Sequence, residues 1–335
     1  MPRKRSEKHL TLRQLERMRS ARGARVGSLE IEGAGPEQEG WVVAHFGLNV
    51  EVEDDQAGRY RCAVREALLD EPVCGDRVVW RRVGVDQGVI VAMHPRRSQL
   101  RRPGPYQRLL TVAANVDRIV VVAASGNLNT GLLDRYLAAA DKAGIEPVLV
   151  VNKIDQGGES GLEELAISPY RRMGYALFRV SALLGVGLAP LEEALAGLTS
   201  VVVGESGVGK SSLINCWIPE ATLKTAAIHE PSGQGRHATT TARLYRMVCG
   251  GALIDSPGVR EFGLHGVTRE EVPGLFRDMV PWVGQCRFSD CRHRQDPGCA
   301  LRAAVERGDV AGERLGSLLR IMESVSAKNP FSSLA

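Results

Sequence analysis

The chain has 335 residues, of which 44% are hydrophobic and 24% charged, and its formal net charge is +4. This length predicts two or three domains rather than one core, and the composition is that of a soluble globular protein. It has no run of about eighteen apolar residues, and its N-terminus lacks an apolar signal-peptide core; we therefore expect a cytoplasmic protein, monomeric and not inserted in a membrane.

The first segment, residues 1–36, is rich in lysine and arginine and shows no sustained apolar period. It ends in Gly33-Ala34-Gly35-Pro36, a composition that favours turns over regular structure. We interpret the segment as a flexible basic extension, which is most often a solvated tail and less often a ligand for an anionic partner.

Residues 37–105 change to short alternating runs separated by turn residues, which predicts four or five short strands. The clearest runs are 41–46, 59–65, 77–82 and 88–93. In the second run, a period of two puts Tyr60, Cys62 and Val64 on one face and arginines on the other. We predict a small OB-like barrel with a basic face suited to RNA, followed by a linker at Pro103-Gly104-Pro105.

From residue 106 to about 268 the pattern is that of an α/β domain with a mostly parallel sheet. The continuous apolar runs 118–123 and 147–151 indicate strands buried on both faces, with a helix over 132–143 between them. Two further strands are predicted at 200–203 and 252–254.

A phosphate-binding loop follows the strand at 200–203. The motif G-x-x-x-x-G-K-[ST] is matched by Gly204-Glu205-Ser206-Gly207-Val208-Gly209-Lys210-Ser211, with Ser212 next. Glycines let backbone N–H groups converge on phosphates at a helix N-terminus, Lys210 neutralises the β and γ charges, and Ser211 can ligate Mg²⁺. A plain glycine-rich turn is the alternative.

The base reader is predicted at the end of the strand 147–151, in Asn152-Lys153-Ile154-Asp155. The Asp155 carboxylate can accept two hydrogen bonds from guanine, whereas adenine offers no such donor pair, and Lys153 can lay its aliphatic stem over the base. Ser181-Ala182 is a plausible support for the base. The sequence therefore favours GTP and GDP over a P-loop kinase or ATPase specific for adenine.

The γ-phosphate side is predicted from Asp255-Ser256-Pro257-Gly258, which ends the strand at 252–254. Asp255 can reach Mg²⁺ through water, and the Gly258 N–H can meet the γ-phosphate. A polar loop with Thr239-Thr240-Thr241 lies between this motif and the phosphate loop, and one of its hydroxyls can complete the Mg²⁺ shell.

These motifs occur in an order that a Ras-like protein does not have. The guanine reader precedes the phosphate loop here, which predicts a circularly permuted GTPase domain. Val259 follows Gly258 where Ras-like enzymes carry a water-orienting glutamine, and an apolar side chain cannot take that role. We expect slow hydrolysis by the isolated protein.

The last segment, residues 269–335, is predicted to be a helical domain stapled by zinc. Cys286, Cys291, His293 and Cys299 form the pattern C-x4-C-x-H-x5-C. Three thiolates and one imidazole are a closed ligand set for one structural Zn²⁺, and chance clustering is the alternative. The remaining cysteines are interpreted as core residues.

The motif order, the barrel and the cysteine–histidine pattern together resemble the ribosome small-subunit-dependent GTPases of the RsgA type, over residues 38 to about 325. The resemblance implies that His237 takes part in hydrolysis and that Thr239 senses Mg²⁺. The family typically has His-Thr-Thr-Thr where this chain has His237-Ala238-Thr239-Thr240, so Thr240 stays an alternative.

The resemblance also implies a GTPase that binds the small ribosomal subunit and its rRNA, assists late maturation of that subunit and is stimulated by it. The alternative function is an RNA-binding scaffold with a vestigial nucleotide domain. The intact Lys210, Ser211 and Asp255 argue against that alternative.

Overall fold

The computed structural model describes residues 34–47, 49–64, 68, 70–104, 108–157, 161–218, 242–256 and 263–328. The chain divides into two compact units, Met1–Arg96 and Arg97–Ala335. The predicted domain limits at residues 36, 105 and 268 stay predictions, and within the described ranges no helix is long and apolar enough to cross a lipid bilayer.

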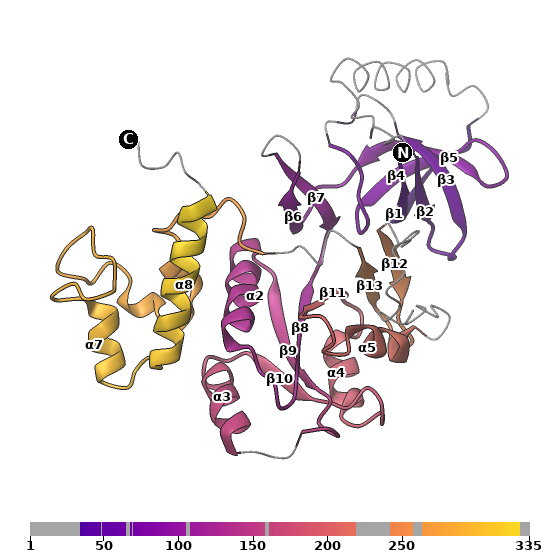
Figure 1. Cartoon of the computed structure of the whole chain (residues 1–335). Helices are drawn as coiled ribbons and strands as arrows, with labels where there is room; N and C mark the ends of the chain where they lie inside the picture. Colours follow the sequence, from indigo (N-terminus) through magenta and orange to yellow (C-terminus); the bar gives the residue numbers. More distant parts are fainter. Residues whose placement is uncertain are drawn as a thin grey trace, which may run out of the picture. The chain divides into compact units, whose positions relative to one another are not determined.

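The first unit contains a closed barrel of five strands (Figure 1). The strands are β1 (Glu37–Phe46), β2 (Asn49–Glu53), β3 (Arg59–Val64), β4 (Arg77–Arg82) and β5 (Gln87–Met93). They pair in the order β1-β2-β3-β5-β4, and β4 returns to β1. Only the β3–β5 pair is parallel among these pairings, which is the connectivity of an OB-fold and confirms the predicted OB-like barrel.

The barrel core follows from the alternation of the strands. Trp80 is fully buried, its indole Nε1 donates to the Glu39 carbonyl (3.3 Å), and the Tyr60 ring lies 4.5 Å from its ring centroid. Gly88 is required beside it, because a Cβ atom there would lie 2.6 Å from the indole. In β3, Cys62 and Val64 are buried and Arg59 and Arg61 exposed, as the period of two predicts.

The second unit is built on a six-stranded sheet in the order β10-β9-β8-β11-β13-β12, in which only β12 is antiparallel to its described neighbour β13. The strands are β8 (Arg118–Ala124), β9 (Glu146–Asn152), β10 (Ala176–Arg179), β11 (Thr199–Gly204), β12 (Arg243–Arg246) and β13 (Ala252–Asp255). This arrangement confirms the predicted mostly parallel sheet. The strand that precedes the phosphate loop, β11, lies inside the sheet.

Helices cover both faces of this sheet (Figure 1). They are α2 (Thr130–Ala143), α3 (Gly161–Arg172), α4 (Leu188–Leu195) and α5 (Lys210–Trp217). Side chains of α4 and α5, with Trp217 fully buried, pack against the valines of β8, β9 and β11 in one core. The helix α2 begins at an Asn129 cap, whose side chain accepts from Leu132 N, and ends at Gly144 in the left-handed region (φ 66°).

The segment with Pro103 and Gly104 differs from the predicted linker. It forms a hairpin of β6 (Gln99–Pro103) and β7 (Leu109–Ala114), in which Gly104 N donates to the Arg108 carbonyl at 2.7 Å. Proline and glycine favour a linker and a hairpin turn alike, so the composition does not separate the two.

The C-terminal part is helical, with η2 (Val272–Leu275), η3 (Val280–Trp282), α7 (Ala300–Glu306) and α8 (Gly312–Lys328). A buried guanidinium joins it to the sheet domain. Arg314 of α8 pairs with Asp278 (2.7 Å) and with Asp134 of α2, and it lies over the Phe276 ring at 4.6 Å. Tyr170 of α3 donates to the same Asp134 carboxylate at 2.7 Å. Burial alone would lower the pKa of Arg314, but the hydrogen bond and charge of Asp278 and the charge of Asp134 raise it, so the guanidinium stays charged.

We predict that Arg314→Met lowers the free energy of unfolding by about 3–5 kcal/mol, because it leaves buried carboxylates without a cation. Arg307→Met is the matched control: Arg307 pairs with Asp309 with about half of its side chain exposed, so the expected loss is about 1 kcal/mol or less. Urea denaturation followed by circular dichroism measures both changes. Equal losses for the two variants would contradict the role of Arg314.

Candidate functional site

The phosphate loop connects β11 to α5 through glycines in conformations that other residues rarely adopt. Gly204 has φ 146°, Gly207 φ 83° and Gly209 φ 95°. A Cβ atom at Gly204 would lie 2.3 Å from the Val122 carbonyl oxygen, so the loop cannot leave the sheet this closely with a larger residue. Gly209 is the N-cap of α5, which directs the first N–H groups of that helix toward the loop.

Lys210 is the first residue of α5 and folds back over the loop. Its ammonium donates to the carbonyls of Gly204 (2.9 Å) and Glu205 (2.6 Å). The ammonium is therefore held at a glycine-rich loop that leads into a helix N-terminus, the arrangement that binds the phosphates of a nucleotide.

The loop Asn152–Asp155 is tied to the phosphate loop by one buried side chain. Asn152 is 1% exposed. Its Nδ2 donates to the Val208 carbonyl at 3.0 Å, and its Oδ1 accepts from Ala182 N at 3.0 Å. Gly209 leaves room for this contact, because a Cβ atom there would lie 2.2 Å from Asn152 Nδ2 and 3.8 Å from Lys153 Cε.

The Asp155 carboxylate is oriented by the segment that follows β10. Ser181 is fully buried, and its hydroxyl donates to Asp155 Oδ1 and accepts from Leu184 N at 3.1 Å. Ile154 N donates to the Val180 carbonyl at 3.3 Å, which fixes the backbone of the same loop. The structure thus brings together three segments that the sequence assigns to one nucleotide: 152–155, 181–182 and 204–211.

The predicted Mg²⁺ ligands are described in part. Asp255 ends β13, whose residue Ile254 pairs with Val201 of β11, and Ser211 is the second residue of α5. Asp255 therefore lies at the carboxyl end of β13, and Ser211 lies on the helix that follows the carboxyl end of the neighbouring strand β11. Ligands of such sheets bind at this edge. His237, Thr239, Gly258 and Val259 lie outside the described residues.

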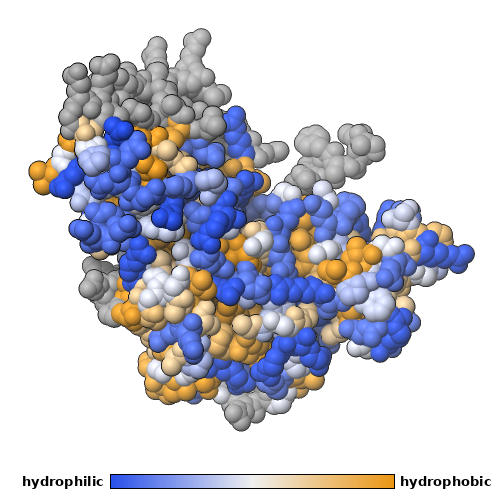
Figure 2. Space-filling model, turned by 180° about the vertical axis from the view of Figure 1, so that it is seen from behind, coloured by the Kyte–Doolittle hydropathy of each residue, from blue (hydrophilic) through white to orange (hydrophobic). Residues whose placement is uncertain are grey.

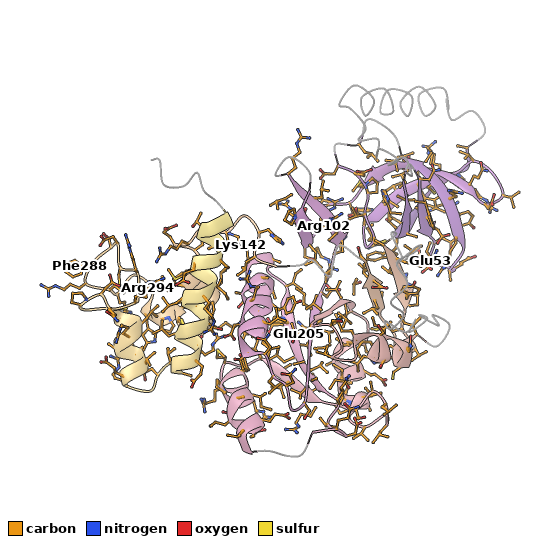
Figure 3. All side chains as sticks on the ribbon, viewed as in Figure 1. Glu53, Arg102, Lys142, Glu205, Phe288 and Arg294 are labelled. Carbon is orange, nitrogen blue, oxygen red and sulfur yellow. The ribbon has the colours of Figure 1, made fainter. Side chains whose placement is uncertain are left out.

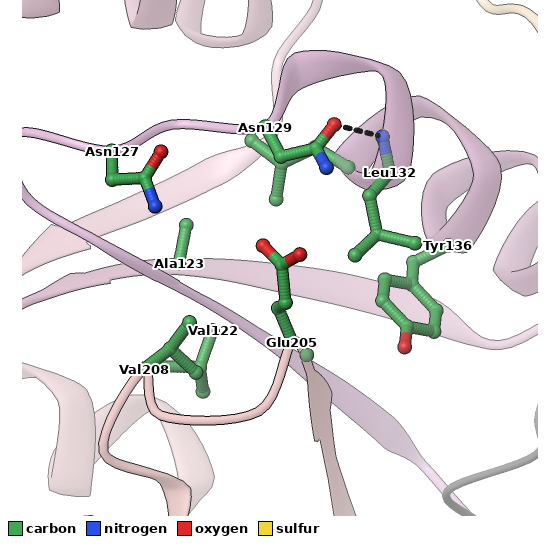
Figure 4. A pocket seen from close by; sticks show the side chains of 10 residues that line it. Val122, Ala123, Asn127, Asn129, Leu132, Tyr136, Glu205 and Val208 are labelled. Carbon is green, nitrogen blue, oxygen red and sulfur yellow. Dashed lines mark hydrogen bonds between the residues drawn. The ribbon is translucent and has the colours of Figure 1, made fainter.

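A pocket beside the phosphate loop contains residues that the motifs do not include. Figure 4 shows the Glu205 carboxylate pointing toward the loop that carries Asn127 and Asn129, with the Tyr136 ring of α2 at one side. Burial and the charge of Glu205 raise the pKa of the Tyr136 hydroxyl, which stays protonated. Asn129 is recognisable in sequence as a helix cap, whereas no sequence signal marks Asn127 or Tyr136.

The cysteine and histidine cluster is assembled as predicted. The ligand atoms of Cys286, Cys291, His293 and Cys299 lie within 4.8 Å of one another. The three sulfur atoms are 3.5–3.6 Å from His293 Nδ1. A tetrahedral zinc ion with Zn–S of about 2.3 Å and Zn–N of about 2.0 Å sets sulfur and nitrogen roughly 3.5 Å apart, so these residues fit Zn²⁺.

The backbone around the cluster is shaped to hold these four ligands. Ala300 N, at the start of α7, donates to Cys286 Sγ (3.4 Å), and His293 adopts a left-handed conformation (φ 59°). Phe288 and Arg294 lie in the surrounding loops (Figure 3). Burial lowers the pKa of His293, which favours the neutral imidazole that coordinates metals.

Comparison with known proteins agrees with this geometry. Residues 93–265 match the family model described as RsgA GTPase. Proteins named small ribosomal subunit biogenesis GTPase RsgA, from Azotobacter vinelandii and Pseudomonas aeruginosa, are 46% identical to this chain over 96% of it and 98% of their own length.

Two solved structures are also similar. The crystal structure of YjeQ from Thermotoga maritima has a TM-score of 0.70 and 30% identity, and the match covers 86% of this chain and 98% of that one. YloQ, described as a circularly permuted GTPase, has a TM-score of 0.69 and 25% identity, with 88% and 96% covered. With its permuted motifs, closed barrel and cysteine–histidine cluster, this chain belongs to the RsgA family of GTPases, enzymes that hydrolyse GTP.

Proposed function

We propose that this GTPase acts in the late maturation of the small ribosomal subunit, which it binds through rRNA and leaves after GTP is hydrolysed to GDP and phosphate. The names of its 46% identical relatives support the subunit as its target. The observation that carries the nucleotide part is the Asn152 side chain, which joins the loop of Asp155 to the phosphate loop. The cytoplasmic location and the monomeric state stay predictions.

In this proposal the two loops grip opposite ends of one guanine nucleotide. Asp155 accepts from the guanine ring N–H and amine, Lys153 covers the base with its stem, and Ser181 and Ala182 support that edge. Lys210 and the N–H groups of residues 204–209 hold the phosphates, while Ser211, Asp255 and Thr239 face the metal. Bound Mg²⁺ would neutralise charge on the phosphate oxygens.

The water-orienting group is proposed to be His237. The residue after Gly258 is Val259, whose side chain has no hydrogen-bonding group. His237 lies in the polar segment between α5 and β12 and can accept a proton or orient water with its imidazole. Binding to the subunit would then complete the site, and hydrolysis would be faster than in the isolated chain.

The barrel is the proposed rRNA surface. Three of its exposed arginines lie over aromatic rings: Arg61 over Phe46 (5.8 Å), Arg77 over Trp41 (5.5 Å) and Arg82 over Tyr60 (5.1 Å). Arg59 is less available, because its guanidinium pairs with buried Glu53 at 3.2 Å. Hydrophilic residues cover much of the barrel in Figure 2, and arginine beside aromatic rings suits both phosphate contact and base stacking.

The alternative function, an RNA-binding scaffold with a vestigial nucleotide domain, differs from this proposal because it predicts no hydrolysis of GTP. It requires a nucleotide domain without function, yet Asp255 ends β13, and Lys210 and Ser211 begin the helix that follows the phosphate loop. GTP hydrolysis measured with and without purified small subunits, with ATP as the control nucleotide, separates the two. Absence of GTP turnover under both conditions would favour the scaffold.

We predict that Asp155→Asn weakens GTP binding by about 10-fold or more and improves binding of xanthosine triphosphate, because an amide donates where the carboxylate accepts. Fluorescence titration with both nucleotides measures the change. Glu164→Gln, an exposed acid outside the site, is the control. Unchanged GTP affinity in Asp155→Asn would remove Asp155 from the base site.

We predict that His237→Ala keeps the affinity for GTP and loses most of the turnover stimulated by small subunits, by about 10²-fold or more. His265→Ala is the control, since this histidine follows the motif of residues 255–258 and is not part of the proposed site. Single-turnover hydrolysis on added subunits measures both. Stimulation equal to that of the unchanged protein would dismiss His237.

We predict that metal analysis finds one zinc ion per chain and that Cys291→Ser reduces it, with a lower melting temperature of the C-terminal part. Cys249→Ser, a half-buried cysteine outside the cluster, keeps the full zinc content. A Cys291→Ser protein with full zinc and unchanged melting would refute the proposed staple.

A further inference from the structure

A buried carboxylate outside the sequence motifs lies close to the guanine-reading loop. Glu163, on the first turn of α3, has a side chain that is 3% exposed. Its Oε2 accepts from the Ser125 hydroxyl at 2.7 Å and from Gly126 N at 2.9 Å. These donors belong to the turn between β8 and α2, whose next residue, Asn127, faces the pocket of Glu205 (Figure 4).

The other carboxylate oxygen of Glu163 meets a cation. Arg179 Nη2 of β10 lies 3.0 Å from Oε1, and this arginine is itself 27% exposed at its side chain. Burying a carboxylate is unfavourable unless hydrogen bonds and a counter-charge compensate it. Here the hydrogen bonds from Ser125 and Gly126 and the ion pair with Arg179 do so. Glu163 therefore joins α3, β10 and the turn after β8.

Of the three partners of Glu163, Ser125 contacts the loop of Asp155 directly, and Arg179 adjoins a residue that does. Ser125 N donates to the Asn152 carbonyl at 2.8 Å, and a Cβ atom at Gly157 would lie 2.1 Å from Ser125 Oγ, so the backbone of the loop runs against this serine. Arg179 directly precedes Val180, whose carbonyl accepts from Ile154 N. The loop thus has contacts with Ser125 and Val180 in addition to the contact of Asn152 with the phosphate loop.

We propose that Glu163 is a positioning residue for guanine recognition, which holds the loop of Asp155 in its binding geometry through Ser125 and Arg179. It touches no part of the base. The inference rests on the proposed base-reading role of Asp155. The position of the Asp155 carboxylate must be fixed to a fraction of an ångström, because two parallel hydrogen bonds to one carboxylate tolerate little displacement.

The test is Glu163→Gln in the full-length chain. A glutamine offers one acceptor oxygen and turns its NH₂ group toward a donor, either Arg179 or Gly126, so the contact cannot be satisfied as before. The readouts are the affinities for GDP and for inosine diphosphate, whose base lacks the exocyclic amine and gives Asp155 one hydrogen bond instead of two. Circular dichroism and thermal melting report whether the variant is folded.

We expect affinity for GDP to fall about 10-fold in Glu163→Gln, with a smaller loss for inosine diphosphate, so that the preference for GDP decreases. Glu306→Gln is the control: the same change at an exposed glutamate of α7, in the C-terminal part, leaves the preference unchanged. A purely structural role would lower both affinities by the same factor, and that result would overturn the inference.

A second variant keeps the inference testable if Glu163→Gln does not fold. Ser125→Ala removes one donor to Glu163 and is expected to reduce the same preference. The double variant should lose no more than the worse single variant, because both act through one contact, whereas independent losses would contradict the connection.

The Asp155→Asn variant separates this inference from the proposed function. If Asp155→Asn does not change the preference between guanosine and xanthosine diphosphates, the base-reading role fails. The other outcome is that Asp155→Asn changes that preference while Glu163→Gln has the same ratio of GDP to inosine diphosphate affinity as the unchanged protein. In that case only the positioning role is wrong.

Discussion

The nucleotide site depends on the buried amide of Asn152, because it sets the separation between the two ends of the site. It donates to Val208 of the phosphate loop and accepts from Ala182 of the base-supporting segment, so both ends of one side chain are used. An aspartate would present a second acceptor to the Val208 carbonyl, and a leucine would leave buried polar backbone groups unpaired. The amide is therefore the group that satisfies both contacts at once in a position that is 1% exposed.

The permuted chain order does not disturb this arrangement, because a parallel sheet collects the carboxyl ends of its strands at one edge whatever the connectivity. The strands β9, β11 and β13 end at Asn152, Gly204 and Asp255. The strand β8 lies between β9 and β11 and pairs with both. What permutation changes is the segment that follows. After β13 the chain enters the helical C-terminal part, whose Arg314 pairs with Asp134 of α2, the same helix whose first turns line the pocket of Glu205. One helix thus contacts both the phosphate loop and the domain that follows it.

Several elements could be predicted from the sequence because their signals are local. The parallel strands are continuous apolar runs, the phosphate loop has a motif with a mechanism, and the four predicted zinc ligands lie together in the structure. The strand β2 carries alternating glutamates and lies outside the runs that predict strands, and the hairpin of β6 and β7 has the proline and glycine of a linker. Glu163 shows the limit most clearly: it and Glu164 are identical neighbours on one helix, yet one is buried and the other exposed. Only tertiary packing distinguishes them.

The exposure of Asp155 explains why so many buried groups surround it. A carboxylate that must meet a ligand from solvent cannot be fixed by packing, and disorder in its loop would reduce binding affinity because that freedom is lost when the nucleotide binds. The loop begins with Lys153 in a left-handed conformation (φ 64°), which disfavours it by about 1–3 kcal/mol in a chain without compensation. Asn152, Ser181 and the Glu163–Ser125 contact supply buried hydrogen bonds around it. The proposed base reader is thus held in place by buried side chains before any nucleotide arrives.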